Sequence, residues 1–504
     1  MNSLHDYLIE ARQKFGNRPY ITEKQEGAWS SNTFQQIIDS AQDFASMLYE
    51  HNLQGKKIAI YAPNSCGWLI ADFAVISYTG VSVPLDTKWK YDDVSNALTF
   101  TEASALIYSE RQKDIIPRLK RKHPDILFIS IEKALEIKIK KKKLIPREPN
   151  DVCKILFSSG TTGKPKAITL TADNMLSGWQ DLSDRIGTAG NAVFVDGVAY
   201  VILPFHHIFC FVVILLWNLF AGVNFYLCSS TDKISDELRE SKPTILYGVP
   251  LIWERIHAKI PSRSLKILRF LLPITDFLMI LRIDVRKKLY GKIHEALGGR
   301  AIILMNGGAA LDPKLRKFYR SVGLPILCGY GLTEAAPIVS ADFVGDGDLT
   351  AQGKIFSITK VKILEPDKDG RGEIAIKGKS VTACYYKNPV LNKEAFTPDG
   401  YLKTGDIGSI GKDNYLFVHG RKKRMILTSN GENVRPEELE RELQKHKVIR
   451  SATVYQVENQ IKARIESSSS RTDIGKIIES INKKQPKYKV IDAFEITNDD
   501  ERLK

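Results

Sequence analysis

The chain has 504 residues, 43% of them apolar and 26% charged, and carries a formal net charge of +15. This apolar content excludes an intrinsically disordered protein, and the length predicts at least two domains rather than one simple core. A basic balance suits polyanionic small molecules, an acidic membrane surface or nucleic acid. Because no zinc-finger, helix-turn-helix or RNA-binding signature is present, we expect no nucleic-acid partner.

The cysteines and the first residues indicate the compartment. The six cysteines form no CxxC pair, and they are Cys66, Cys153, Cys210, Cys228, Cys328 and Cys384. Their scatter argues against a structural zinc site or a disulfide framework and for a reducing compartment. Residues Met1–Asp6 lack the basic-then-apolar layout of a signal peptide. We therefore expect a cytoplasmic protein.

Short apolar runs alternate with helical patterns over the first 110 residues or so. Helices are expected within residues 4–50, around a strand at Pro19–Thr22, and again at Trp68–Tyr78. Further strands are expected at Lys57–Tyr61, Val81–Pro84 and Ala105–Tyr108. The alternation predicts an α/β fold with a mainly parallel sheet covered by helices on both faces. Ligands of such sheets bind beyond the carboxyl ends of the strands.

A polar loop follows, between expected strands at Lys154–Phe157 and Ala167–Leu170. Its residues are Ser158, Ser159, Gly160, Thr161, Thr162, Gly163, Lys164, Pro165 and Lys166. Glycine lets the backbone approach a ligand closely, and the hydroxyls and lysines add hydrogen-bond donors and charge, which suits a polyphosphate. The Walker pattern does not apply, because Pro165 stands where that pattern has Ser or Thr. Taken alone, the loop also fits an ordinary polar turn.

Two apolar stretches need separate interpretations. Residues 198–227 are strongly apolar, but His206 and His207 interrupt the run, and a membrane span needs about 20 apolar residues. We expect a buried helix there, at Phe209–Phe220. In Arg263–Lys292, apolar residues alternate irregularly with basic ones. This segment fits either a peripheral face resting on an anionic membrane or two core helices, and both interpretations stay open.

A smaller unit is expected near the C-terminus. The turn residues before Gly372 precede an expected strand at Glu373–Gly378. The pattern changes near Gly420, where a short strand is expected at Met425–Leu427. Asn433–Leu439 is expected to open a helix, with proline and carboxylates in its first turn.

The loop resembles the phosphate loop of the adenylate-forming superfamily. Five further stretches resemble that family's motifs in order: Leu203–His207 (LPxxH), Asn306–Ala309, Gly329–Glu334, Tyr401–Asp406 and Gly420–Lys423. The resemblance runs from about the first helix to nearly the last residue, and Pro243–Pro250 is most similar to the fatty acyl-CoA synthetase branch. It implies an AMP-binding domain over residues 1–419 and a small, short α+β domain over 420–504. The small domain is implied to rotate at the hinge position Lys423.

The resemblance also implies residue roles. Its catalytic group is Thr162, Lys166, His207 and Glu334, with Glu334 as magnesium ligand and His207 beside the acyl group. Nucleotide binding is implied for Ser158, Ser159, Gly160, Thr161, Thr162, Gly163, Lys164, Gly307, Gly308, Ala309, Tyr330, Gly331, Thr333, Asp406 and Arg421. Asp406 would accept hydrogen bonds from the ribose hydroxyls, because an ionised carboxylate is an acceptor only.

The implied reaction activates a medium- or long-chain fatty acid with ATP and Mg²⁺ through an acyl-adenylate, then transfers the acyl group to coenzyme A. Loading of an acyl carrier protein, or another carboxylate-CoA ligation, is the alternative chemistry. The family's C-terminal Gly-Lys context is missing, since the sequence there reads Asn498–Lys504. A nucleotide-binding protein with impaired turnover is therefore a further alternative. If the membrane interpretation of Arg263–Lys292 holds, the protein would lie in the cytoplasm with contact to the inner membrane face.

Overall fold

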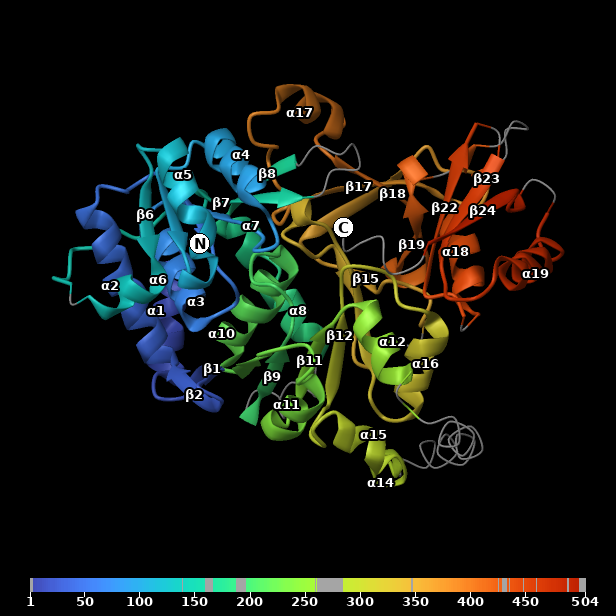
Figure 1. Cartoon of the computed structure of the whole chain (residues 1–504), viewed down its shortest axis with the longest axis horizontal. Coiled ribbons are helices and arrows are strands. Elements are labelled where there is room, and N and C mark those ends of the chain that lie inside the picture. The colour runs from blue at the N-terminus through green and yellow to red at the C-terminus, as the bar shows by residue number, and fades with distance from the viewer. Residues whose placement is uncertain are drawn as a thin grey trace. The chain divides into compact units, whose positions relative to one another are not determined.

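The computed structural model describes residues 3–137, 139–158, 166–186, 196–258, 260, 284–345, 348–424, 426–427, 433–434, 436–446, 448–458, 460–486 and 489–497. The chain divides into two compact units (Figure 1). The first consists of Met1–Val361, Ile376–Leu402 and Gly411–Phe417, and the second of Lys362–Ala375, Lys403–Ile410 and Val418–Lys504. The expected boundary at residues 419/420 stays a prediction.

A six-stranded sheet forms part of the first unit, in the order β6-β5-β3-β4-β7-β8. Its strands are β3 (Lys57–Tyr61), β4 (Val81–Pro84), β5 (Ala105–Tyr108), β6 (Leu127–Ser130), β7 (Val152–Ser158) and β8 (Lys166–Thr171). All neighbouring strands run parallel except the β7–β8 hairpin. Three strands coincide with the expected ranges because each is a short apolar run that the sheet buries.

A nine-stranded sheet forms another part of the first unit, in the order β15-β14-β13-β12-β11-β9-β10-β1-β2. Its strands are β1 (Pro19–Gln25), β2 (Ala28–Thr33), β9 (Val198–Val201), β10 (Asn224–Leu227), β11 (Ile245–Gly248), β12 (Ile303–Asn306), β13 (Ile326–Tyr330), β14 (Ser340–Ala341) and β15 (Lys354–Ile355). The central strands are parallel, and the β1–β2, β13–β14 and β14–β15 pairs are antiparallel. The expected mainly parallel α/β architecture is confirmed.

Helices connect the strands of the first unit. They are α1 (Leu4–Phe15), α2 (Phe34–Glu50), α3 (Cys66–Ala74), η1 (Val75–Thr79), α4 (Tyr91–Thr101), η2 (Glu110–Ile115), α5 (Ile116–Lys122), α6 (Ile131–Glu136), α7 (Ala172–Leu176), α8 (Trp179–Ile186), η3 (Phe209–Leu216), α10 (Trp217–Ala221), α11 (Ile234–Ser241), α12 (Pro250–Ala258), α14 (Arg286–Leu289), α15 (Gly291–Ala296), α16 (Pro313–Ser321), η4 (Thr333–Ala335), α17 (Pro389–Ala395) and η5 (Lys412–Asn414). Capping residues fix where helices begin, as at α2. The Thr33 hydroxyl accepts from Gln36 N, and the Gln36 side chain accepts from Thr33 N, which forms a capping box.

The apolar run expected to be a buried helix forms η3 and α10, and this prediction is confirmed. Polar side chains of the nine-stranded sheet reach it: the Tyr20 hydroxyl donates to Leu215 O at 2.8 Å, and the Tyr247 hydroxyl pairs with Asn218 Oδ1 at 3.1 Å. On its other side, Phe211 packs against Trp68 of α3. Among the residues that the structure describes, no helix is long and apolar enough to cross a membrane.

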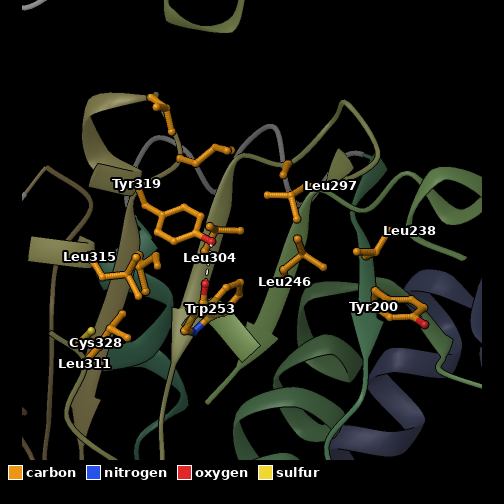
Figure 2. Close-up of a cluster of buried hydrophobic side chains, with 14 of the residues drawn as sticks. Tyr200, Leu238, Leu246, Trp253, Leu297, Leu304, Leu311, Leu315, Tyr319 and Cys328 are labelled. Carbon is orange, nitrogen blue, oxygen red and sulfur yellow. Dashed lines mark hydrogen bonds between the residues drawn. The ribbon is translucent and has the colours of Figure 1, made fainter. Parts of the chain in front are cut away.

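An apolar cluster holds α11, α12, α15 and α16 against the nine-stranded sheet. Figure 2 shows Tyr319 of α16 pointing toward Trp253 of α12, and the Tyr319 hydroxyl donates to Trp253 O at 3.0 Å. Leu246 and Leu304 supply the sheet's side of the cluster. This core fixes the sheet whose strand ends carry three of the sequence motifs.

The second unit is smaller and contains mixed sheets and two longer helices. The strands of a four-stranded sheet contribute residues to it, in the order β16 (Thr359–Leu364), β17 (Gly372–Gly378), β18 (Leu402–Ile410) and β19 (Leu416–Arg421). The remaining elements are η6 (Lys422–Arg424), β20 (Ile426–Leu427), β21 (Asn433–Val434), α18 (Pro436–Gln444), β22 (Ser451–Val457), β23 (Gln460–Glu466), α19 (Arg471–Asn482) and β24 (Ala493–Thr497). The helix expected from Asn433 begins at Pro436 instead, because Asn433 and Val434 pair with β20. The expected α+β character is confirmed.

Candidate active site

Three sequence motifs follow the carboxyl ends of parallel strands in the nine-stranded sheet. Strands β9, β11, β12 and β13 are parallel neighbours. The stretch Leu203–His207 follows β9, Gly307–Ala309 follows β12, and Gly331–Glu334 follows β13. Because the carboxyl ends of neighbouring parallel strands lie at one edge of a sheet, the fold collects these motifs there.

Gly307 and Gly308 leave this edge as nearly bare backbone. A Cβ atom at Gly307 would lie 2.6 Å from the Phe209 ring, and Gly308 has a φ of +81°, which favours glycine. Gly307 is buried, whereas Gly308 and Ala309 are exposed. The Phe209 contact joins the start of η3, two residues after His207, to the end of β12. The structure therefore brings His207 and the Gly307–Ala309 stretch to one region.

Close backbone contacts and buried hydrogen bonds fix the end of β13 and the stretch that follows it. A Cβ atom at Gly331 would lie 1.6 Å from Pro337 O, so only glycine fits. Asp342, which is buried, accepts from Cys328 N at 2.7 Å and pairs with Arg316 at 2.5 Å. These contacts fix the backbone that leads into Tyr330 and Gly331. Tyr330 is half-buried at the end of β13.

His207 is an exposed residue two positions before η3. Its N–H donates to Pro204 O at 3.1 Å, and its carbonyl accepts from Phe211 N at 3.0 Å. Asn64 fixes the same turn, because its side chain donates to Leu203 O and accepts from Phe205 N, both at 2.8 Å. Desolvation by the surrounding protein lowers the pKa of His207, so its ring is neutral at pH 7.

His206 differs from its neighbour because a carboxylate faces it. Its Nε2 lies 3.9 Å from Asp86 Oδ2. Desolvation lowers the pKa of His206, and the charge of Asp86 opposes that shift. The two adjacent histidines therefore stand in different electrostatic surroundings, and His207 is the one without a nearby carboxylate in the described part of the chain.

Glu334 and Lys166 meet at the side chain of Tyr385. The Tyr385 hydroxyl donates to Glu334 Oε1 at 2.9 Å, and Thr382 N donates to Glu334 O at 2.7 Å. Lys166 Nζ lies 5.2 Å from the centroid of the Tyr385 ring, within range of a cation–π contact. Burial, and then the charge of Glu334, raise the pKa of the Tyr385 hydroxyl, so it stays a donor at neutral pH.

The ends of the polar loop lie opposite each other. Ser158, the last residue of β7, pairs with Lys166, the first residue of β8. The other loop residues assigned to phosphate binding lie outside the described residues, and they are Ser159, Gly160, Thr161, Thr162, Gly163 and Lys164. Thr333 begins η4 and stands next to Glu334. The two ends of the loop therefore lie side by side on β7 and β8. Tyr385 contacts both Lys166 and Glu334.

Asp406 and Arg421 form an ion pair within the second unit. Arg421 Nε lies 2.8 Å from Asp406 Oδ1; the carboxylate is 5% exposed and the guanidinium 49% exposed. The Thr404 hydroxyl accepts from Asp406 N at 3.1 Å and donates to Ile374 O at 2.8 Å. These contacts hold the carboxylate on β18. Lys423, the expected hinge position, lies in η6, and its side chain is outside the described residues.

The structure adds residues that the sequence did not reveal. Tyr385 lies 51 positions from Glu334, and Asn64 lies 139 positions from Leu203. Neither carries a local pattern, and only the fold brings each to its partner. Within the described ranges, no group of three or more His, Cys, Asp or Glu side chains could hold a metal ion by itself.

Comparison with known proteins places the chain in a family. Residues 8–386 match the family model described as AMP-binding enzyme. The chain is 31% identical over 384 residues to "Long-chain-fatty-acid--CoA ligase 3" of Saccharomyces cerevisiae, covering 69% of this chain and 53% of that protein. It is 26% identical to "Long-chain-fatty-acid--CoA ligase ACSBG2" of Gallus gallus, covering 87% of this chain and 63% of that protein. The chain thus spans between half and two thirds of the length of these two relatives.

A solved structure agrees with the fold. The o-succinylbenzoate coenzyme A synthetase of Bacillus subtilis, in complex with ATP and magnesium ion, superposes with a TM-score of 0.78 at 20% identity. The match covers 97% of this chain and 95% of that one. The family match extends over the motifs at Ser158–Lys166, Leu203–His207, Asn306–Ala309 and Gly329–Glu334. The expected resemblance is therefore confirmed, and this chain belongs to the family of AMP-binding enzymes.

Proposed function

We propose that the chain is an AMP-forming ligase that activates a medium- or long-chain fatty acid and transfers the acyl group to coenzyme A. The observation that carries the proposal is the junction of Lys166 and Glu334 at Tyr385, because it brings the end of the polar loop to the acidic end of the Gly329–Glu334 motif. The fatty-acid assignment is supported by two relatives whose names are long-chain-fatty-acid CoA ligases.

The chemistry has two steps. A carboxylate oxygen of the fatty acid attacks the α-phosphorus of ATP, and pyrophosphate leaves as the acyl-adenylate forms. The sulfur of coenzyme A then attacks the acyl carbonyl carbon, and AMP leaves with the bonding electrons. Ser158–Lys166 would bind the β- and γ-phosphates and offset the charge of the leaving group. Neutral His207 would contact the acyl group, and Asp406 would accept from the ribose hydroxyls.

Magnesium fits one acidic residue of this site. Glu334 is half-buried, and its Oε1 accepts from Tyr385, so the carboxylate is oriented. Magnesium prefers hard oxygen ligands, often one or two carboxylates together with substrate phosphates. We therefore propose Glu334 as the protein ligand, with the ion supplying charge neutralisation at the phosphates. The Bacillus subtilis synthetase, which has this fold, was solved in complex with ATP and magnesium ion, and this supports magnesium as the cofactor.

The direct test measures ATP–pyrophosphate exchange with a panel of fatty acids, followed by thioester formation with coenzyme A or an acyl carrier protein. Exchange with long acids and transfer to coenzyme A would support the proposal. Transfer to the carrier protein alone would show that the carrier protein, and not coenzyme A, is the acyl acceptor. Nucleotide binding without exchange would refute the enzyme assignment.

The variant Glu334→Gln is expected to lower the exchange rate ~100-fold or more, the scale of losing one electrostatic contributor. Glu295→Gln, an exposed glutamate in α15, is the matched control and should leave the rate unchanged. Equal rates for Glu334→Gln and the wild type at saturating magnesium would remove Glu334 from the site.

Peripheral membrane contact is a second, separable proposal. Most of the segment that suggested it, residues 263–283, lies outside the described residues. In the part that is described, Lys287 and Lys288 are exposed on α14 beside Leu289, which is 45% exposed. An apolar side chain flanked by lysines suits an anionic lipid surface, where each basic residue contributes ~1 kcal/mol.

Co-sedimentation with anionic and neutral vesicles at low and high salt tests this contact. We expect a preference for anionic vesicles that salt weakens, and that Lys287→Gln/Lys288→Gln reduces. Replacing Lys483 and Lys484, an adjacent exposed pair in the second unit, is the control. If the protein binds anionic and neutral vesicles equally, the membrane proposal is wrong and the interpretation of the segment as two core helices is favoured.

A further inference from the structure

A lysine and an aspartate form a fully buried ion pair beneath the strand that leads into the polar loop. Lys154 lies in β7 and Asp72 in α3, and their side chains are 1% and 0% exposed. Lys154 Nζ lies 2.7 Å from Asp72 Oδ1 and 2.6 Å from Oδ2. The Ser82 hydroxyl of β4 donates to Asp72 Oδ1 at 2.6 Å. The carboxylate therefore accepts from two different strands.

The surroundings of the ammonium group are aromatic. Lys154 Nζ lies 3.8 Å from the centroid of the Phe211 ring and 5.6 Å from that of Trp68. Both rings are buried, so water does not replace these contacts. Desolvation lowers the pKa of Lys154, and Asp72 opposes that shift. The ammonium thus interacts with a carboxylate on one helix and an aromatic face on another.

Stability alone does not account for such a pair. Removing two charges from water costs several kcal/mol per ion, and replacing buried pairs with apolar residues of similar volume is often neutral or stabilising. The pair instead fixes the relative positions of four elements, because Lys154, Asp72 and the residues that contact them lie in β7, α3, β4 and η3. It fixes β7 against α3, β4 and η3 at one point.

Two of these elements lead directly to candidate site residues. Lys154 and Ser158 lie four positions apart on β7, hence on the same face and about 13 Å apart along the strand. Phe211 lies in the first turn of η3, and its N–H donates to His207 O at 3.0 Å. A shift of the Lys154 ammonium would therefore displace both the base of the loop and the turn that carries His207.

We propose that Asp72 and Lys154 are positioning residues for adenylation, which set β7 and η3 so that Ser158, at the base of the polar loop, and His207 are aligned. The inference rests on the proposed function, because it presumes that the loop binds ATP phosphates. Neither side chain touches substrate. Their effect is expected to be larger on the adenylation step than on the later transfer to coenzyme A, because the transfer no longer involves the β- and γ-phosphates and depends only on the acyl group beside His207.

The decisive variant replaces both partners, Asp72→Leu with Lys154→Met. Removing one partner would leave an unpaired buried charge, whereas removing both leaves only the Ser82 hydroxyl without its acceptor, so thermal stability is expected to stay close to that of the wild type. The adenylation step should nevertheless lose ~10-fold or more, seen as a higher KM for ATP in ATP–pyrophosphate exchange, because misplacement by about 1 Å can cost ~100-fold. Thioester formation from preformed acyl-adenylate should lose clearly less than the adenylation step does.

A matched control separates positioning from general loss of a buried carboxylate. Glu237 of α11 is fully buried and accepts from the Tyr200 hydroxyl of the nine-stranded sheet at 2.7 Å, whereas β7 belongs to the six-stranded sheet. Glu237→Gln should leave the KM for ATP unchanged. Should the double variant fail to fold, Ser82→Ala decides, because it removes one hydrogen bond to Asp72 and keeps the ion pair. A raised KM for ATP in Ser82→Ala supports the inference, and a wild-type value overturns it.

The outcomes also distinguish this inference from the proposed function. A wild-type protein that shows no ATP–pyrophosphate exchange with any acid refutes the proposed function, and the inference with it. An active wild type with an equally active, stable double variant refutes the inference alone. Equal losses in both half-reactions would also refute it, since a purely structural defect acts on both.

Discussion

The contact between Tyr385 and Glu334 gives the sharpest test of the site as the structure has it. Replacing Tyr385 by Phe removes the 2.9 Å hydrogen bond to Glu334 Oε1 and keeps the aromatic ring. The ring's other contact, with Lys166 Nζ at 5.2 Å, does not require the hydroxyl. The substitution therefore isolates the orientation of one carboxylate.

The magnitude follows from the type of bond and the burial of its partners. A hydrogen bond to a charged group contributes about 1.5–3 kcal/mol. Tyr385 is 5% exposed, but Glu334 is only half-buried and water can replace part of the contact, so the lower end of that range applies. A loss of about 1.4 kcal/mol corresponds to about a tenfold change in rate.

The assay is ATP–pyrophosphate exchange at several magnesium concentrations. Tyr385→Phe is expected to lower kcat/KM about tenfold and to raise the magnesium concentration for half-maximal rate, because Glu334, the proposed ligand, would be less ordered and would bind the ion more weakly. Since the pKa of Tyr385 is raised above its ordinary value of about 10, the wild type should show no loss of this hydrogen bond from about pH 6 to about pH 9.

The neighbouring tyrosine supplies the control. The Tyr386 hydroxyl donates to Thr101 O at 3.4 Å and does not approach Glu334 in the described contacts. Tyr386→Phe should stay within about twofold of the wild type, since a bond this long is weak. If both variants lose activity equally, or Tyr385→Phe keeps wild-type magnesium dependence, the proposed orientation of Glu334 is wrong.

Three further predictions concern other parts of the chain. Asp406→Ala should weaken ATP binding by about 1.5–3 kcal/mol in calorimetric titration, while the melting temperature stays nearly constant because half-exposed Arg421 can turn to water; unaltered affinity would make the pair purely structural. Gly331→Ala should prevent correct folding, since its Cβ would lie 1.6 Å from Pro337 O, whereas Gly291→Ala meets no atom within 4 Å and should fold normally. His294 is buried, its Nε2 donates to Val322 O, and desolvation lowers its pKa, so its contribution to stability is full above about pH 6.5 and falls as the pH drops below that value. His294→Gln should therefore reduce the loss of melting temperature on acidification, and an unchanged loss would contradict this assignment.

Much of the fold could be predicted because a buried strand appears in the sequence as a short run of apolar residues. The strands at Lys57–Tyr61, Val81–Pro84 and Ala105–Tyr108 are apolar runs bounded by polar residues, and each forms as expected. Strand β2, at Ala28–Thr33, was not expected, because its partly polar sequence lies at the sheet edge and has no buried face. The start of α18 was placed too early for a related reason: a two-residue strand is shorter than any periodicity can reveal.

The site residues divide in the same way. Gly307, Gly331 and Glu334 lie within contiguous motifs, and backbone constraints such as the 1.6 Å approach at Gly331 explain why those residue types are needed. Tyr385 has no such motif around its hydroxyl. Its role depends on a partner 51 positions away, and a pairing over that separation leaves no trace in one sequence.

Three polar contacts link the six-stranded sheet and the segments beside it to the edge of the nine-stranded sheet. Asn64, after β3, holds the backbone at Leu203, Lys154 on β7 lies against Phe211, and Tyr385, beside β8, holds Glu334. Each of these contacts meets the far sheet within a few residues of a motif. Strand order brings the motifs to one edge, but it does not set their distance from the loop between β7 and β8. These three side chains lie outside the sequence motifs, and we expect them to set that distance.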